Sequence, residues 1–306
     1  MKPGSIIGII ISSFLILAGI ITCSVGVVMS KSEDRALFTQ KTKDGTYYNA
    51  SVPDTTAKIQ LSVRDAEITV RGGAEKSQIE FINFNPNFYS VSSTPSVTSF
   101  EEIPDLRSAV KIWENGVVFK GLRYALDIRN FEYGQLDKSI IVSLSDDSAL
   151  KIVDITAENG KIKVEDLSFS GDILLKTEIG NIDISGVSTD STISISGDLL
   201  TSTVSASEAK TLKFYGHESN LTVKDSSFTD AQIDTVSGRI DYYTEEDLSH
   251  AQINISSSTG GMLINSKPIT GVFTAEPEEF DKTLKIKTDS AGVNLEYPHE
   301  EKTDTE

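Results

Sequence analysis

The chain has 306 residues, a formal net charge of −17 and a single cysteine, Cys23. This length leaves room for one large domain or two modest ones beyond a targeting segment. The excess of carboxylates excludes a nucleic-acid partner, because no cluster of Lys and Arg offsets the negative field. One cysteine forms neither a disulfide framework nor a thiolate metal site.

The first element is an uncharged segment over residues 6–29. As a helix it would be about 36 Å long, enough to cross a hydrocarbon core of roughly 30 Å. We therefore predict a cytoplasmic stub and a transmembrane helix over 1–30. A cleaved signal peptide is the alternative, although its apolar part normally has about 7 to 15 residues. A lipoprotein signal at Cys23 matches poorly, because Thr22 stands where a small residue is expected.

The charges beside this segment give a mixed indication of its orientation. Lys2 precedes it, whereas Lys31, Arg35, Lys41 and Lys43 follow it. By itself, the positive-inside rule would place the following domain in the cytoplasm, but long domains are translocated largely regardless of charge. We expect a single-pass protein of the cell membrane whose C-terminal domain lies outside the cytoplasm.

Residues 31–56 are polar and without apolar periodicity, and we interpret them as a stalk. A folded domain then opens with two short runs in which apolar and polar residues alternate on either side of a turn at Ala66. This alternation is the pattern of half-buried strands. The apolar members are Ile59, Leu61 and Val63 before the turn, and Ile68 and Val70 after it.

The segment 77–147 interrupts this pattern and is rich in aromatic residues. Because a solenoid needs its first coil covered, we interpret the segment as an insertion or cap with an aromatic core. The alternative is an aromatic platform for a glycan or a protein partner. Its candidate binding residues are Trp113, Phe119 and Tyr124.

From Val153 to Leu295 a sequence repeat of about twenty residues occurs seven times. It consists of two apolar residues two positions apart, a turn, and a second apolar pair. The turn positions are Gly160, Gly180, Leu200, Ser219, Gly238, Gly260 and Ala291. The first pairs are Val153/Ile155, Ile173/Leu175, Ile193/Ile195, Leu212/Phe214, Ala231/Ile233, Ile253/Ile255 and Leu284/Ile286. The second pairs are Ile162/Val164, Ile182/Ile184, Ser202/Val204, Leu221/Val223, Ile240/Tyr242, Met262/Ile264 and Val293/Leu295.

This spacing predicts two strands per repeat with the paired residues on one face. A single repeat buries too little apolar surface to offset the entropy of ordering its backbone, so the repeats must stack. We predict an all-β, parallel β-solenoid over 57–297, with the main array at 150–297 and an inserted loop before the last copy. A further apolar residue after five of the seven turns predicts a third side to the coils, at Leu167, Val187, Phe228, Leu248 and Ile269.

The chain ends in a short acidic tail over 298–306, and it shows no catalytic constellation. Metalloprotease, nucleophile-elbow, P-loop and dinucleotide-binding motifs are all absent from the sequence. We interpret His217, His250 and His299 as surface residues, and acidic runs such as Glu245-Glu246-Asp247 as solvated turns without calcium-loop spacing. We therefore expect no enzymatic activity, no cofactor and no metal site.

Three alternatives stay open. Parallel β-helices also host polysaccharide lyases and hydrolases, which would need carboxylates from neighbouring coils to converge with a Lys or Arg. Asp154, Asp183 and Asp241 are outward carboxylates on which this can be checked. The chain could instead be an accessory subunit that contacts a membrane protein through its stalk or helix, or it could self-associate through exposed coil ends.

Four segments resemble the bacterial "putative adhesin" β-strand-repeat family DUF4097: 139–144, 155–164, 176–184 and 235–241. The last three contain the family's degenerate signature, a glycine followed by alternating apolar residues, and the resemblance extends over roughly 57–297. It implies a β-solenoid domain that is commonly membrane-tethered and exposed at the bacterial envelope, with some members linked to envelope-stress systems. We accordingly expect an adhesin-like module, or a scaffold and sensor of the envelope, with a glycan or membrane-protein partner.

Overall fold

The computed structural model describes residues 40–42, 45–53, 55–83, 89–93, 97–102, 138–145 and 149–298. Within these residues the chain forms strands joined by turns and contains no helix, so the predicted all-β class is confirmed. No helix in this part of the chain is long and apolar enough to cross a membrane. The predicted transmembrane helix lies outside the described residues, as do residues 31–39, 43–44 and 54 of the predicted stalk.

The chain divides into two compact units. The smaller unit comprises 1–48, 82–89 and 103–136, and its described part includes β1 (Gln40–Thr42) and the start of β2 (Gly45–Ser51), which pair antiparallel. The larger unit comprises 49–81, 90–102 and 137–306. It contains all seven repeats and also the isolated copy that begins at Ile59.

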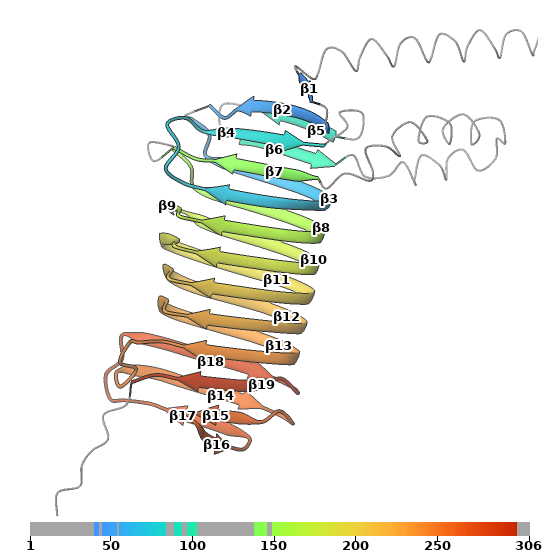
Figure 1. Ribbon diagram of the computed structural model, residues 1–306. Helices are drawn as coiled ribbons and strands as arrows, with labels where there is room; N and C mark the ends of the chain where they lie inside the picture. The colour runs from blue at the N-terminus through green and yellow to red at the C-terminus, as the bar shows by residue number, and fades with distance from the viewer. Residues whose placement is uncertain are drawn as a thin grey trace, which may run out of the picture. The chain divides into compact units, whose positions relative to one another are not determined.

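A stack of long parallel strands forms the core of the larger unit (Figure 1). Each strand of the stack pairs in parallel with the next, so that Val153 lies beside Ile173 and Ile173 beside Ile193. The copy at Ile59, although distant in sequence, pairs directly with the first repeat of the array. The strands in order are β3 (Lys58–Arg71), β8 (Ile152–Glu165), β10 (Asp172–Ser185), β11 (Ser188–Ser205), β12 (Glu208–Lys224) and β13 (Ser227–Tyr243).

Each long strand bends in its middle, so that its two halves lie on opposite sides of one coil (Figure 1). In β8 the odd-numbered Val153 and Ile155 are buried before the bend, whereas the even-numbered Ile162 and Val164 are buried after it. The buried positions change from odd to even residue numbers at the bend, so the side chains of both halves of the strand point into the same interior. Every paired position predicted to point inward is buried, including the polar exception Ser202.

The corners leave no room for a Cβ at their glycines. A Cβ built on Gly180 would lie 1.9 Å from the carbonyl oxygen of Gly160, and one on Gly216 would lie 2.4 Å from the Ser219 side chain. Glycine stands at the turn position in four corners, but in β11 and β12 it stands three residues earlier and the turn position carries a buried side chain. The two remaining corners have alanine at the turn, Ala66 and Ala291. The corner pairs that contain glycine are Ala157/Gly160, Thr177/Gly180, Gly197/Leu200, Gly216/Ser219, Thr235/Gly238 and Ser257/Gly260.

A short third side closes each coil after a residue with positive φ, namely Asp166, Gly186, Ala206 or Asp225. Of the residues predicted to point inward here, four are buried, and Ile269 is partly exposed because it lies in a terminal hairpin. Strand β9 (Ser168–Phe169) pairs with the start of β11 on this side. The four buried residues are Leu167, Val187, Phe228 and Leu248.

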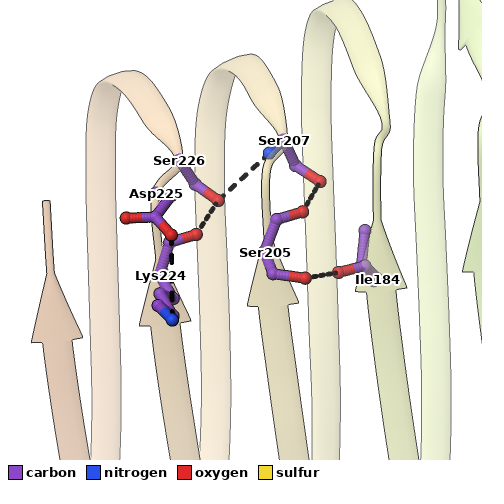
Figure 2. A network of polar contacts seen from close by, with 6 residues as sticks. All are labelled: Ile184, Ser205, Ser207, Lys224, Asp225 and Ser226. Atoms are coloured by element: carbon purple, nitrogen blue, oxygen red, sulfur yellow. Dashed lines mark hydrogen bonds and ion pairs between the residues drawn. The ribbon is translucent and has the colours of Figure 1, made fainter. Parts of the chain in front are cut away.

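Two buried serines, Ser207 and Ser226, also point inward near this third side, and Figure 2 shows their hydrogen bonds to each other and to Ser205 and Lys224. Ser207 Oγ donates to the carbonyl of Ser205 at 2.8 Å and accepts from the N–H of Val187 at 3.2 Å. Ser226 Oγ donates to the carbonyl of Lys224 at 2.9 Å and accepts from the N–H of Ser207 at 3.1 Å. The polar side chains therefore join successive coils at little cost in desolvation.

The coil before β3 is made from two separate strands. β6 (Val97–Glu102) pairs with the first half of β3, and β7 (Ser139–Ser143) pairs with its second half. Residues 103–137, which connect these two strands in the chain, lie outside the described residues. Two further strands, β4 (Gln78–Ile82) and β5 (Tyr89–Ser93), also belong to the segment interpreted as an insertion or cap.

The last two repeats are exchanged in space relative to their order in the chain. β18 (Lys282–Thr288) and β19 (Gly292–Glu296) pair with β13, although they belong to the final repeat. The preceding repeat, β14 (Ala251–Ser257) and β15 (Met262–Ile264), packs outside them.

The segment before the last copy is therefore not a plain inserted loop, as the sequence had suggested. It contains β16 (Lys267–Ile269) and β17 (Val272–Ala275), which pair antiparallel with β15 and β14. These two strands cover the outer edge of the last coil. Self-association would require an exposed strand edge, and at the C-terminal end of the solenoid these two strands cover that edge.

We predict that Gly180→Ala destabilises the solenoid by about 2–4 kcal/mol, because the new methyl group would overlap the carbonyl oxygen of Gly160. Chemical denaturation measures this change. Gly261→Ala is the matched control, since a Cβ on Gly261 meets nothing within 4 Å. Equal losses of unfolding free energy in the two variants would show that the corner at Gly180 is not sterically tight.

Alanine substitutions at two buried serines are predicted to change the free energy of unfolding in opposite directions. Ser202 Oγ is buried between Ile182 and Leu221 and has no hydrogen-bond partner among the described residues, so Ser202→Ala should raise the free energy of unfolding by about 1 kcal/mol. Ser207→Ala should lower it by about 1–3 kcal/mol, because the N–H of Val187 would lose its acceptor. Changes of the same sign in the two variants would contradict this account.

Alkaline pH should weaken the fold through Tyr242. Burial, assisted by the charge of Glu246, raises the pKa of this phenol above its ordinary value of 10.0. Its contribution to stability is therefore complete below about pH 10 and is lost as the pH rises toward the higher folded-state pKa. Tyr242→Phe should flatten the decline of the denaturation midpoint above pH 10, whereas Tyr215→Phe, at an exposed position, should leave it unchanged.

Candidate functional site

A shallow groove crosses five successive coils at the corner where the long strands bend. One row of residues runs along it, and each member pairs in register with the next: Lys176, Ser196, Tyr215, Asp234 and Lys287. A second row stands two residues further along the chain in four of these coils: Asp198, His217, Val236 and Asp289. We call these two rows the corner groove.

The groove residues point outward because each follows a buried neighbour. Tyr215 comes directly after Phe214, and Lys287 directly after Ile286, and both preceding side chains are in the core. Neighbouring parallel strands lie roughly 4.8 Å apart, so the row from Lys176 to Lys287 extends about 19 Å. Its side chains stand on paired strands, which makes their spacing rigid.

The charged groups of the corner groove are mostly not engaged with one another. Among the described residues, Lys176, Lys287, Asp198 and Asp289 form no ion pair, although both signs occur in one groove. Asp234 is held by a residue outside the groove, because its Oδ2 accepts a hydrogen bond from Gln232 at 3.1 Å. The groove therefore presents donors and acceptors that are available to a ligand.

Comparison with known proteins shows the family of this chain. The family model described as Toastrack DUF4097 matches residues 114–306. The chain belongs to the Toastrack DUF4097 family. No curated protein matches the Toastrack sequence.

Two solved structures are similar to this Toastrack chain. One is a "putative cell adhesion protein" from Clostridium sporogenes ATCC 15579, with 10% identity and a TM-score of 0.39, covering 82% of this chain and 99% of the other. The second is a "putative adhesin" from Bacteroides fragilis NCTC 9343, with 12% identity and a TM-score of 0.39, covering 83% and 98%.

A second hollow lies at the C-terminal end of the Toastrack repeats. Its rim carries the carboxylates of Asp225, Glu245 and Glu296 and the amine of Lys267. Tyr297 also lines it, and burial together with the charge of Asp247 raises the pKa of this phenol. Within the described part of the chain, no group of three or more His, Cys, Asp or Glu side chains is arranged to hold a metal ion.

The outward carboxylates singled out in the sequence do not come together. Asp154 pairs with Lys58 at 2.8 Å, Asp183 with Lys161 at 3.1 Å, and Asp241 with Arg239 at 2.7 Å. None of the three lines the corner groove. The strong hydrogen bond to Asp241 raises the pKa of Arg239, but the guanidinium is charged at any physiological pH.

The other sequence candidates have separate positions. Trp113, Phe119 and Tyr124 lie outside the described residues. In the acidic run, Glu246 pairs with Lys282 at 2.7 Å, and Asp247 accepts two hydrogen bonds from Ser249 at 2.9 Å, an arrangement typical of a turn. His217, interpreted as an isolated surface residue, is exposed and lines the corner groove.

Sequence reasoning missed the row from Lys176 to Lys287. Aligning the repeats and comparing equivalent outward positions would have found its first four members. It would then have placed Ser256 beside Asp234, because Ser256 follows in the chain. Lys287 takes that place only because the last two repeats are exchanged in space.

Proposed function

We propose that this Toastrack protein is a membrane-anchored, surface-exposed and non-enzymatic module of the cell envelope, which acts as an adhesin-like or scaffold and sensor protein. The observation that carries the proposal is the corner groove, an open row of available polar groups held in register across five coils. A rigid surface of this kind favours binding of an extended partner, because the surface loses little conformational entropy when the partner binds. The uncharged segment over 6–29 supports the anchor.

A polysaccharide-active enzyme is the second candidate, and one observation favours it. Asp234, Asp289 and Lys287 come from neighbouring coils and line one groove, as such an enzyme would need. We place binding first because two of the three aspartates that line the groove, Asp198 and Asp289, are exposed, and Asp234 is only half-buried. They lack the desolvated surroundings in which a carboxylic acid serves as a proton donor.

We predict that protease added to intact cells removes a C-terminal tag from the full-length protein. A cytoplasmic marker should stay intact in the same sample, which shows that the cells are sealed. A tag that remains protected in intact cells, but is cleaved after lysis, would overturn the surface assignment.

Replacing residues 6–29 by an unrelated membrane anchor separates the proposal from the accessory-subunit alternative. An envelope module that works through its solenoid should keep its cell-binding activity with the new anchor. Loss of that activity, with the protein still exposed at the surface, would favour a subunit that acts through its own helix.

A further inference from the structure

The strongest unassigned feature of the described surface is the chemistry of the corner groove. We propose that it binds a neutral, polyhydroxylated glycan chain that lies along the row from Lys176 to Lys287. This inference rests on the proposed binding function and names the ligand class of that site. Length, charge, and the apolar centre each support it.

The length of the groove favours an oligomer over a single small molecule. The row from Lys176 to Lys287 crosses four strand spacings, about 19 Å in all. Its lining residues come from β10, β11, β12, β13 and the β18 region, so the polar groups are presented at a constant interval. A chain of several sugar rings presents hydroxyl groups along its whole length in a similarly regular way.

The charges of the groove disfavour a ligand with a strong net charge. Two lysines, Lys176 and Lys287, stand against three aspartates, Asp198, Asp234 and Asp289. The aspartates would repel a polyanion, and the lysines would repel a polycation. Hydroxyl groups both donate and accept hydrogen bonds, so a neutral glycan can satisfy carboxylates and ammonium groups together.

The centre of the groove supplies an apolar contact. The Tyr215 side chain is 40% exposed and that of Val236 is 39% exposed, and both line the groove. An aromatic ring packs well against the C–H face of a sugar, and the tyrosine hydroxyl offers a hydrogen bond at the ring edge.

An extended peptide fits this surface less well. Peptides that bind to sheets usually add a strand to a free edge and use main-chain hydrogen bonds. The corner groove lies across the faces of strands whose edges are already paired with both neighbouring coils. A peptide would therefore have to rely on side-chain contacts alone.

Binding of the full-length protein in detergent to an array of neutral, anionic and cationic oligosaccharides, together with extended peptides, tests the proposal. We expect neutral oligosaccharides to bind best, with little dependence on salt concentration. Calorimetry with the strongest neutral binder should then show that Tyr215→Ala weakens binding about tenfold or more, since central aromatic contacts carry much of the binding energy.

Phe280→Ala is the matched control, because this aromatic side chain is 52% exposed and does not line the groove. It should leave the affinity unchanged, and both variants should unfold at the wild-type midpoint. Equal losses from the two variants, preferred binding of anionic or peptide ligands, or no loss from Tyr215→Ala would each overturn the glycan assignment. Recovery of the neutral oligosaccharide in cleaved form would overturn the non-enzymatic proposal instead.

Cell-binding assays separate the two levels of inference. Surface-exposed protein that still binds cells after Tyr215→Ala would refute the glycan site and leave the envelope role in place. Wild-type protein that is not exposed at the surface would refute the envelope role, whatever the purified chain binds.

Discussion

The in-register backbone ladder between coils is the constraint on which the rest of the structure depends. Each inward pair is covered only when a neighbouring coil lies on both sides, and the ladder fixes which residues become neighbours. Inside the coil it brings Ile173 beside Val153 and Ile193, which makes a continuous apolar column. Outside the coil the same ladder arranges unrelated side chains into rows. The corner groove is one such row.

The corners show how this constraint tolerates variation. A Cβ on a turn glycine would meet the backbone of the neighbouring coil, and a Cβ on Gly216 would meet the Ser219 side chain of its own corner. Six corners have a glycine at one of these two positions, whereas β3 and the last repeat have Ala66 and Ala291 at the turn. Leu200 and Ser219 stand where four other repeats have glycine, yet both are buried there because Gly197 and Gly216 provide the small position instead. The departure that the sequence shows is thus a local exchange within the same corner.

Periodicity predicts most of the solenoid because alternation along a strand is a local property. The inward residues, the corners and the buried Leu167 and Val187 all follow from spacing along the chain. The order of the last two repeats does not, because either repeat offers β13 the same apolar pattern, and only three-dimensional packing selects between them. The full groove row could not be predicted for the same reason, since Lys287 reaches it through that exchange.

The exchanged repeats also limit how such a protein can lengthen during evolution. A copy of one repeat inserted between β8 and β13 extends the stack by one coil and leaves both ends as they are, because each interior coil presents the same ladder above and below. A copy added after Leu295 would find its place already occupied, since β14 and β15 lie there, sealed by β16 and β17. Gene duplication can therefore change the reach of this solenoid from its interior, whereas its C-terminal end stays closed to growth.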